Sequence, residues 1–289
     1  MKPRPKSVVL DLLSSLRTHS APVRFLVAAA AIFDIDSNAT RVAITRLLAC
    51  GLIERDERGA YRTGSAATPI LRRLTSWKRI AGRTRDWDGS WIGATPDVAC
   101  PNKDARAASV RALEFTGMRE FSPGLWIRPD NLDGGLDAYR ESLQALRLPP
   151  SCPVFRMLDF DAAGEARARA LWDADAIRSL YRSLATEVER STAALPTLEE
   201  KTALAESFLL GGEAIRRIVL DPLLPDAIVP TAERDALVRA MTAYDEVGRR
   251  AWAPFLARYG VLASEPPMDR QLWRDAPPIE FPASAGEPA

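Results

Sequence analysis

The chain has 289 residues, and its 47% hydrophobic and 27% charged residues are typical of a folded globular protein. No apolar run approaches the roughly 20 residues that a membrane-spanning helix needs, which argues against a membrane protein. The 3 cysteines, Cys50, Cys100 and Cys152, are too widely spaced for a metal knuckle or a disulfide framework. A reduced, cytoplasmic setting fits this composition.

The net charge of +1 conceals an uneven distribution. Residues 1–85 contain 16 Lys and Arg against 6 Asp and Glu, whereas the rest of the chain contains 23 against 32. A basic end on an acidic body is typical of a protein that docks one domain on a polyanion. Charge alone would equally suit RNA or an anionic membrane surface, so the pattern of elements has to decide the partner.

Residues 7–36 predict two helices and a turn. The first is expected over residues 7–17, and Pro22 fits the first turn of a second helix that runs to about Phe33. Residues 34–36 then form a turn. The residues of the first helix expected to face a core are Val8, Leu12, Leu13 and Leu16.

A third helix is predicted to start after a cap at Asp36 or Ser37 and to stop at Gly51, since glycine enters the left-handed conformation easily. The helical spacing of Ile44, Leu47 and Leu48 predicts its buried face. The opposite face carries side chains that can bond guanine or adenine edges, touch a thymine methyl group or hold phosphates. The residues of this helix expected to contact DNA are Asn38, Thr40, Arg41, Val42, Thr45 and Arg46.

Two short strands are predicted over residues 52–55 and 61–63, joined by a tight turn. Arg58 in the turn and Arg62 in the second strand are expected to contact DNA as well. Helix and hairpin together predict the reading half of a winged helix-turn-helix on double-stranded DNA. The alternative is an ordinary amphipathic helix whose charged face is merely solvated.

The centre of the chain predicts a small α+β unit. Residues 64–86 read as a basic connecting helix, which either touches phosphates beside the wing or is a solvated linker. The order that follows is β-α-β-α-β, with helices expected on one face of a sheet. Its elements are a strand within 87–94, a helix at 103–117, a Pro-Gly turn and strand at 121–129, a helix at 132–146 and a strand at 151–160.

Beyond this unit the pattern is helical, with a proline-punctuated corner at 221–230. The expected fold class is α+β multidomain. The expected divisions are a winged-helix domain at 1–63, the connecting helix at 64–86, an α+β domain at 87–165, a helical domain at 166–262 and a flexible tail at 263–289.

Few residues suggest catalysis. His19 is the only histidine, which removes most catalytic triads and zinc sites. Neither of the common Gly-rich phosphate-binding motifs occurs, and no cofactor is expected. Asp159 and Asp161 follow a strand and suit Mg²⁺, which leaves a metal-dependent nuclease as an alternative. Strand-end aspartates are more often solvated or capping residues, so no catalytic or metal site is expected.

Several blocks of the sequence resemble the PaaX family of bacterial transcriptional regulators. The matching segments are ATRVAITRLLACGLIER at 39–55, WDGSW at 87–91, PGLWIRPDNL at 123–132, LWD at 171–173 and RRIVLDPLLPDAIVP at 216–230. The downstream blocks are the specific part, because winged helices are common. Over residues 7–260 the resemblance implies a winged-helix domain, a central ferredoxin-like domain similar to a Cas2 fold, and a helical C-terminal domain.

The resemblance also implies a homodimer that represses a catabolic operon from a palindromic operator and is released by an aryl- or acyl-CoA effector. A CoA thioester has an apolar acyl end and an anionic end, so its pocket should join aromatic side chains to arginines. The alternative is that the tryptophans fill the core of the sheet and the seams between domains. An effector-independent DNA-binding activator is a further alternative. The residues expected to bind the effector are Trp91, Arg119, Phe121, Trp126, Arg128 and Trp172.

Overall fold

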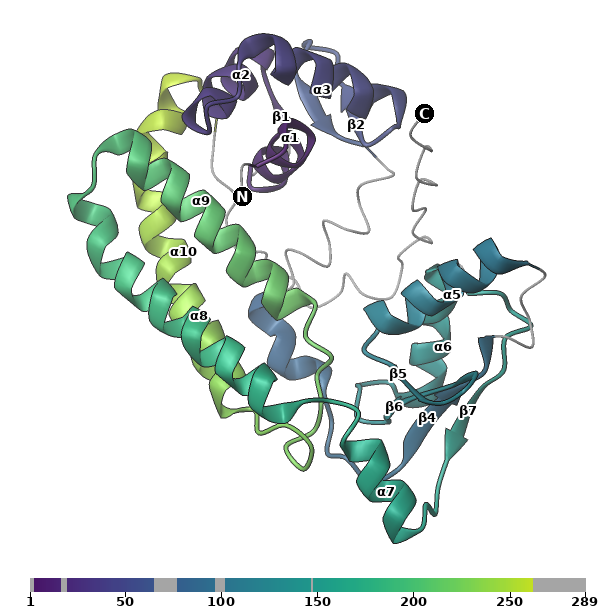
Figure 1. Ribbon diagram of the computed structural model, residues 1–289. Coiled ribbons are helices and arrows are strands. Elements are labelled where there is room, and N and C mark those ends of the chain that lie inside the picture. Colours follow the sequence, from purple (N-terminus) through teal and green to yellow (C-terminus); the bar gives the residue numbers. More distant parts are fainter. Residues whose placement is uncertain (1–2, 17–19, 65–76, 97–101, 147, 262–289) are drawn as a thin grey trace.

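A computed structural model describes residues 3–16, 20–64, 77–96, 102–146 and 148–261. Helices and two antiparallel sheets make the described chain α+β, as predicted. Three parts lie in an arc, with the N-terminal helices at one end, a long helical bundle in the middle and a four-stranded sheet at the other end (Figure 1). None of the described helices is long and apolar enough to cross a membrane. His19, most of the predicted connecting helix and the predicted tail lie outside the described residues.

The N-terminal part consists of three helices and a small sheet. The helices are α1 (Pro5–Ser14), α2 (Val23–Ile32) and α3 (Ser37–Ala49). The strands β1 (Ser20–Ala21), β2 (Ile53–Arg55) and β3 (Tyr61–Thr63) pair in the order β1-β3-β2. The sequence did not predict β1, because two residues are too few to show an alternating pattern. The residues of α1 and its end expected to be buried, Val8, Leu12, Leu13 and Leu16, all are.

The core of this N-terminal part is shared with the C-terminal helices. The ring of Phe25 on α2 lies 5.9 Å from the ring of Phe255 and 5.7 Å from that of Tyr259. Farther along, the rings of Phe33 and Phe208 are 4.9 Å apart. The N-terminal helices and two later helices, which contain Phe208 and Phe255, therefore pack into one continuous apolar cluster.

The central sheet contains β4 (Trp91–Ala94), β5 (Arg119–Ser122), β6 (Leu125–Pro129) and β7 (Val154–Met157) in the antiparallel order β5-β6-β4-β7. Helix α5 (Lys103–Phe115) follows β4, and α6 (Gly135–Ala145) follows β6. The predicted β-α-β-α-β order missed β5, the first arm of a hairpin. Strand β5 begins with the charged residues Arg119 and Glu120, and its four residues are exposed or half-buried. It therefore lacks the alternation of apolar and polar residues that indicates a strand.

Helices cover both faces of this sheet, which corrects the prediction of a single covered face. On one face α5 and α6 pack with Ile92 and Trp126. On the other face α7 (Ala162–Arg169) and the corner at 221–230 pack with Trp91 and Ile127. Alternate residues of β4 and β6 therefore enter different cores, as the period of a strand requires.

The long bundle consists of α8 (Ala174–Ala194), α9 (Glu200–Val219) and α10 (Ala232–Arg258), close to the helices predicted there. A short 3-10 turn, η4 (Leu195–Thr197), joins the first two. The end of the predicted connecting helix is a kinked 3-10 segment, η2 (Trp77–Arg83). Its Trp77 and Ile80 are buried in the core of the bundle, so this end belongs to the bundle rather than to the wing.

Candidate nucleic-acid interface

The limits of α3 follow from local chemistry. The Asp36 carboxylate accepts the backbone N–H of Ala39 over 2.9 Å, which makes Asp36, of the two residues considered, the helix cap. Gly51 adopts a φ of 65°, the left-handed conformation expected after the helix end. Ile44 and Leu47 are buried as predicted, but Leu48 is 36% exposed. Successive side chains of an α-helix point in different directions around its axis. Leu48, which follows Leu47, therefore points away from the other helices.

The outer face of α3 presents polar and cationic side chains to solvent. Arg41 and Arg46 are exposed, and no ion pair is recorded for either guanidinium within the described residues. Between them Val42 is 41% exposed, unusual for an apolar residue on a packed helix. Asn38 and Thr45 share this exposed face. The two arginines are therefore free hydrogen-bond donors beside the methyl groups of Val42, whereas the Thr45 hydroxyl donates to the Arg41 carbonyl over 3.1 Å.

Thr40 does not belong to this face. Its side chain is 0% exposed, and its hydroxyl donates to the carbonyl oxygen of Asp36 over 2.9 Å. The burial contradicts the prediction that Thr40 contacts DNA. Its hydroxyl instead satisfies one carbonyl of the first turn and helps to seat α3 on the helices beneath it.

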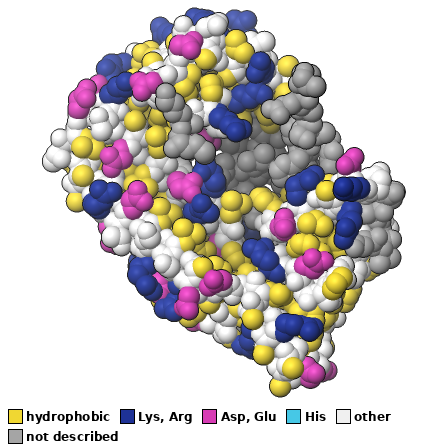
Figure 2. Space-filling view, in the orientation of Figure 1, with side chains coloured by type: hydrophobic (Ala, Val, Ile, Leu, Met, Phe, Trp, Pro, Cys, Tyr) yellow, Lys and Arg dark blue, Asp and Glu magenta, His cyan; other side chains and the backbone are white. Residues whose placement is uncertain are grey.

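The hairpin places its two predicted arginines differently. Arg58 lies in the turn between β2 and β3 and is exposed. Arg62 lies on β3, where its guanidinium pairs with the Glu54 carboxylate of β2 over 3.0 Å. Arg58 is therefore the freer cation of the two. In the space-filling view, Lys and Arg side chains are spread over the N-terminal part at the top (Figure 2).

The residues expected to bind the effector are not brought into one site. Trp91 and Trp172 stack with ring centres 6.1 Å apart on the α7 face, and Phe121 borders the same cluster. Trp126 is buried on the opposite face, against α5 and α6. Arg119 is exposed on the edge strand β5. The sheet itself separates these aromatic side chains, and the three tryptophans fill cores, as the alternative interpretation held.

Arg128, the remaining expected effector residue, is 1% exposed. Its guanidinium donates to the carbonyl oxygens of Thr116 (2.6 Å), Pro129 (3.1 Å) and Pro222 (3.1 Å), and to Asn131 Oδ1 (3.2 Å). Burial lowers the pKa of the guanidinium from its usual value. With these partners the side chain holds the sheet to the corner at 221–230, and is not available to a ligand.

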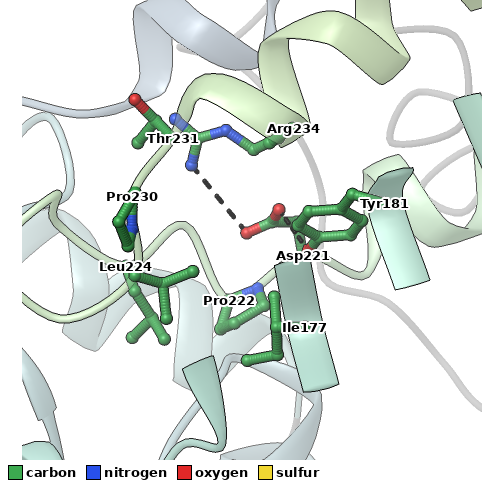
Figure 3. Close-up of a pocket in the computed structure, with 9 residues that line it drawn as sticks. Ile177, Tyr181, Asp221, Pro222, Leu224, Pro230, Thr231 and Arg234 are labelled. Atoms are coloured by element: carbon green, nitrogen blue, oxygen red, sulfur yellow. Dashed lines mark hydrogen bonds and ion pairs between the residues drawn. The ribbon is translucent and has the colours of Figure 1, made fainter. Parts of the chain in front are cut away.

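A small cleft lies where this corner meets α8 and α10 (Figure 3). The Asp221 carboxylate accepts the Tyr181 hydroxyl (2.5 Å) and the Leu223 N–H (2.5 Å), and lies 3.9 Å from the Arg234 guanidinium. Burial raises the pKa of Asp221 in spite of these partners. The cleft has room for about one water molecule, far less than an acyl-CoA needs.

The aspartates considered for a metal site have other surroundings. Asp161 caps α7, its carboxylate accepting the Gly164 N–H over 2.6 Å. Asp159 is exposed, with a φ of 58°. Across the described ranges, no group of three or more His, Cys, Asp or Glu side chains is placed to hold a metal ion.

Comparison with known proteins finds a family likeness in the C-terminal part. Residues 172–256 match the family model described as PaaX-like protein C-terminal domain. We refer to residues 172–256, which are similar to that domain, as the PaaX-like region. The match begins at Trp172 and spans α8, the corner and most of α10, so it contains both the cleft and one of the carbonyl groups that Arg128 binds, that of Pro222.

A solved structure, an uncharacterized protein (Rv0674) from Mycobacterium tuberculosis, resembles most of the chain. It is 24% identical in sequence, with a TM-score of 0.55, and the likeness covers 85% of this chain and 97% of the other. At this identity the likeness shows a shared fold. No curated protein matches the chain.

Proposed function

We propose that this PaaX-like protein is a transcriptional regulator that reads double-stranded DNA with α3. The PaaX-like match suggests a regulatory rather than an enzymatic protein. The observation that carries the proposal is the outer face of α3, where Arg41, Val42 and Arg46 are exposed while the opposite face is anchored in a core. An anchored helix with free donors on its outer side has the form that the major groove accommodates.

The side chains of this face suit base edges. An arginine such as Arg41 or Arg46 can pair with guanine through two hydrogen bonds, and Asn38 can do so with adenine. Val42 suits the methyl group of thymine. The β2–β3 hairpin then serves as the wing, with Arg58 directed at the phosphate backbone or the minor groove. This is a winged helix-turn-helix, to which we assign residues 1–63.

The other divisions of the chain form part of the same proposal. The sheet order β5-β6-β4-β7, built as β-α-β-β-α-β, supports a ferredoxin-like central domain over residues 87–165. The helical domain extends over residues 166–262. We propose that two copies bind a palindromic operator as a repressor, which requires their reading helices to lie about 34 Å apart, one turn of DNA.

Regulation by an aryl- or acyl-CoA effector completes the proposal. Such an effector would favour a dimer whose two α3 helices no longer match the half-sites, and operator DNA must then weaken effector binding by the same factor. Titrating benzoyl-, phenylacetyl- and acetyl-CoA with and without operator tests this reciprocity. Equal affinities would refute effector control and favour an effector-independent binder.

The DNA-binding step has its own experiment. Selection from a random duplex pool with the full chain should enrich a sequence with two-fold symmetry. Fluorescence anisotropy on that duplex should then show an affinity that falls steeply between about 50 and about 200 mM salt, because bound phosphates release counterions. A pool that stays unenriched, together with binding that ignores salt, would overturn the proposed function.

A further inference from the structure

The turn of the hairpin is closed by one carboxylate. Oδ1 of Asp56 accepts the backbone N–H groups of Arg58 (2.9 Å) and Ala60 (2.8 Å). The backbone closes the same turn, because the Asp56 N–H donates to the Ala60 carbonyl over 2.8 Å and the Gly59 N–H donates to the Asp56 carbonyl over 3.0 Å. An aspartate that binds the N–H groups following it fixes the shape of a turn.

The second carboxylate oxygen ties the turn to the rest of the N-terminal part. Oδ2 of Asp56 accepts the hydroxyl of Ser20 over 3.0 Å. Ser20 lies in β1, which pairs with β3 and leads into α2. Desolvation opposes the charged form of Asp56, but the bonds from Ala60, Ser20 and Arg58 and the charge of Arg58 outweigh it, so the pKa of the carboxyl is lowered. Both oxygens are thus engaged in holding the turn.

Arg58 is carried by this turn. Its backbone is bound to Asp56, while its side chain is exposed and no hydrogen bond of its guanidinium is recorded in the described part of the chain. Next to it, Gly59 has a φ of 78°, and a Cβ added there would lie 3.3 Å from Nη2 of Arg55. The turn is compact, because the Arg55 side chain fills the space next to Gly59, and it presents the Arg58 side chain to solvent. Fixing the backbone beforehand reduces the entropy lost when a side chain binds a partner.

We propose that Asp56 is a positioning residue, which fixes the wing so that Arg58 reaches the phosphate backbone of the DNA bound by α3. The inference rests on the proposed function and adds to it a residue, Asp56, whose negative charge alone would weaken DNA binding. A carboxylate close to phosphates weakens binding through repulsion. Asp56 therefore contributes to binding through the geometry of the turn, and against its own charge.

The two effects of Asp56 predict opposite changes in affinity. Loss of its charge alone would raise the affinity for DNA, whereas loss of the turn geometry would lower it. Operator affinity is measured by fluorescence anisotropy, over a range of salt concentrations, for the full chain and for Asp56→Ala, Arg58→Ala and both together. Glu57→Ala is the matched control, because Glu57 is an exposed carboxylate of the same turn. Removing Glu57 should leave affinity unchanged or raise it. Removing Asp56 should lower affinity, and the slope of log affinity against log salt should fall by about 1, as for the loss of Arg58.

The double variant separates positioning from general damage to the fold. If Asp56 acts through Arg58, the double variant binds within about twofold of Arg58→Ala alone. Asp56→Asn keeps an oxygen that accepts both N–H groups and should bind at least as well as the natural chain. Ser20→Ala removes only the hydrogen bond from the Ser20 hydroxyl to Asp56. It should lower affinity less than Asp56→Ala, and this loss should also vanish when Arg58 is absent. If Asp56→Ala melts below the assay temperature, Ser20→Ala replaces it.

The inference is overturned if Asp56→Ala binds like Glu57→Ala, or if the losses from Asp56 and Arg58 simply add. A natural chain without salt-dependent duplex binding would overturn the proposed function itself. If the natural chain binds and Arg58→Ala weakens it while Asp56→Ala and Ser20→Ala do not, only the positioning role fails.

Discussion

The guanidinium of Arg128 donates a hydrogen bond to the carbonyl oxygen of Pro222, 94 residues later in the chain, over 3.1 Å. Asn131 adds a second bond, from its side-chain N–H to the Leu223 carbonyl over 2.7 Å. Gly117 leaves space for this contact, because a Cβ there would lie 2.9 Å from the Cβ of Pro222. The corner of the PaaX-like region is thereby docked onto the central sheet.

Replacing Arg128 should destabilise the protein strongly. Arg128→Met leaves buried carbonyl oxygens without donors, and each such acceptor costs roughly 1–3 kcal/mol. We expect the free energy of unfolding to fall by about 3 kcal/mol or more, measured by urea denaturation. Arg119→Met is the control, since Arg119 lies exposed on the neighbouring strand and should change stability by less than about 0.5 kcal/mol. Equal effects would contradict the docking role.

Arg41 should determine base preference. Arg41→Ala is expected to lose roughly 1–3 kcal/mol of discrimination at one base pair in each half-site. Arg24→Ala is the matched control, because Arg24 is an exposed arginine on α2 and its loss changes the net charge equally. Selection from a random pool followed by competition binding measures both. An unchanged preference in Arg41→Ala would exclude Arg41 from the groove.

The two threonines of α3 should behave oppositely. Thr40→Val removes a buried hydroxyl bond to Asp36 and should cost about 1 kcal/mol of stability while base preference stays the same. Thr45→Val changes an exposed position and should leave stability within about 0.5 kcal/mol while altering base preference. Thermal unfolding and competition binding on each variant test the pair. A shifted base preference in Thr40→Val would show that Thr40 is accessible to DNA after all.

Glu233 should make the stability of the protein depend on pH in the acidic range. Hydrogen bonds from Arg178 and Arg182 lower the pKa of the Glu233 carboxyl from 4.5 to about 2. A lowered pKa in the folded state contributes stability above 4.5, which is lost as the pH falls toward 2. Glu233→Gln should therefore lower Tm at neutral pH, by a difference that shrinks over this window. Glu246→Gln, which removes an exposed i,i+4 pair, should change Tm little throughout.

Much of the fold was predictable because its elements carry local signals. The cap at Asp36, the stop at Gly51 and the proline corner at 221–230 all lie where turn chemistry placed them. β1 was missed because it depends on pairing with the distant strand β3, and β5 because its partly exposed residues show no apolar alternation. The exposure of Leu48 was missed because Leu48 lies at the border of the buried face. The burial of Thr40 was missed because its polar side chain suggested DNA contact, although its spacing places it with Ile44 and Leu47 on the buried face.

The candidate site was predictable in part for a related reason. Helical spacing assigned the outer face of α3, and Arg41, Val42 and Arg46 are exposed there. The effector set rested on residue type alone, and aromatic residues serve cores as readily as ligands. Arg128 could not be recognised as structural from the sequence, because its partner Pro222 belongs to a different part of the chain.

The apolar cluster that joins Phe25 to Phe255 and Tyr259 bears on the order of events during synthesis. The first helices leave the ribosome before α10 has been synthesised. Their shared core therefore cannot form until residues more than two hundred positions downstream have been added. Until then α2 exposes apolar surface that a chaperone can bind. The core beneath α3 is therefore complete only after translation of the gene is nearly finished.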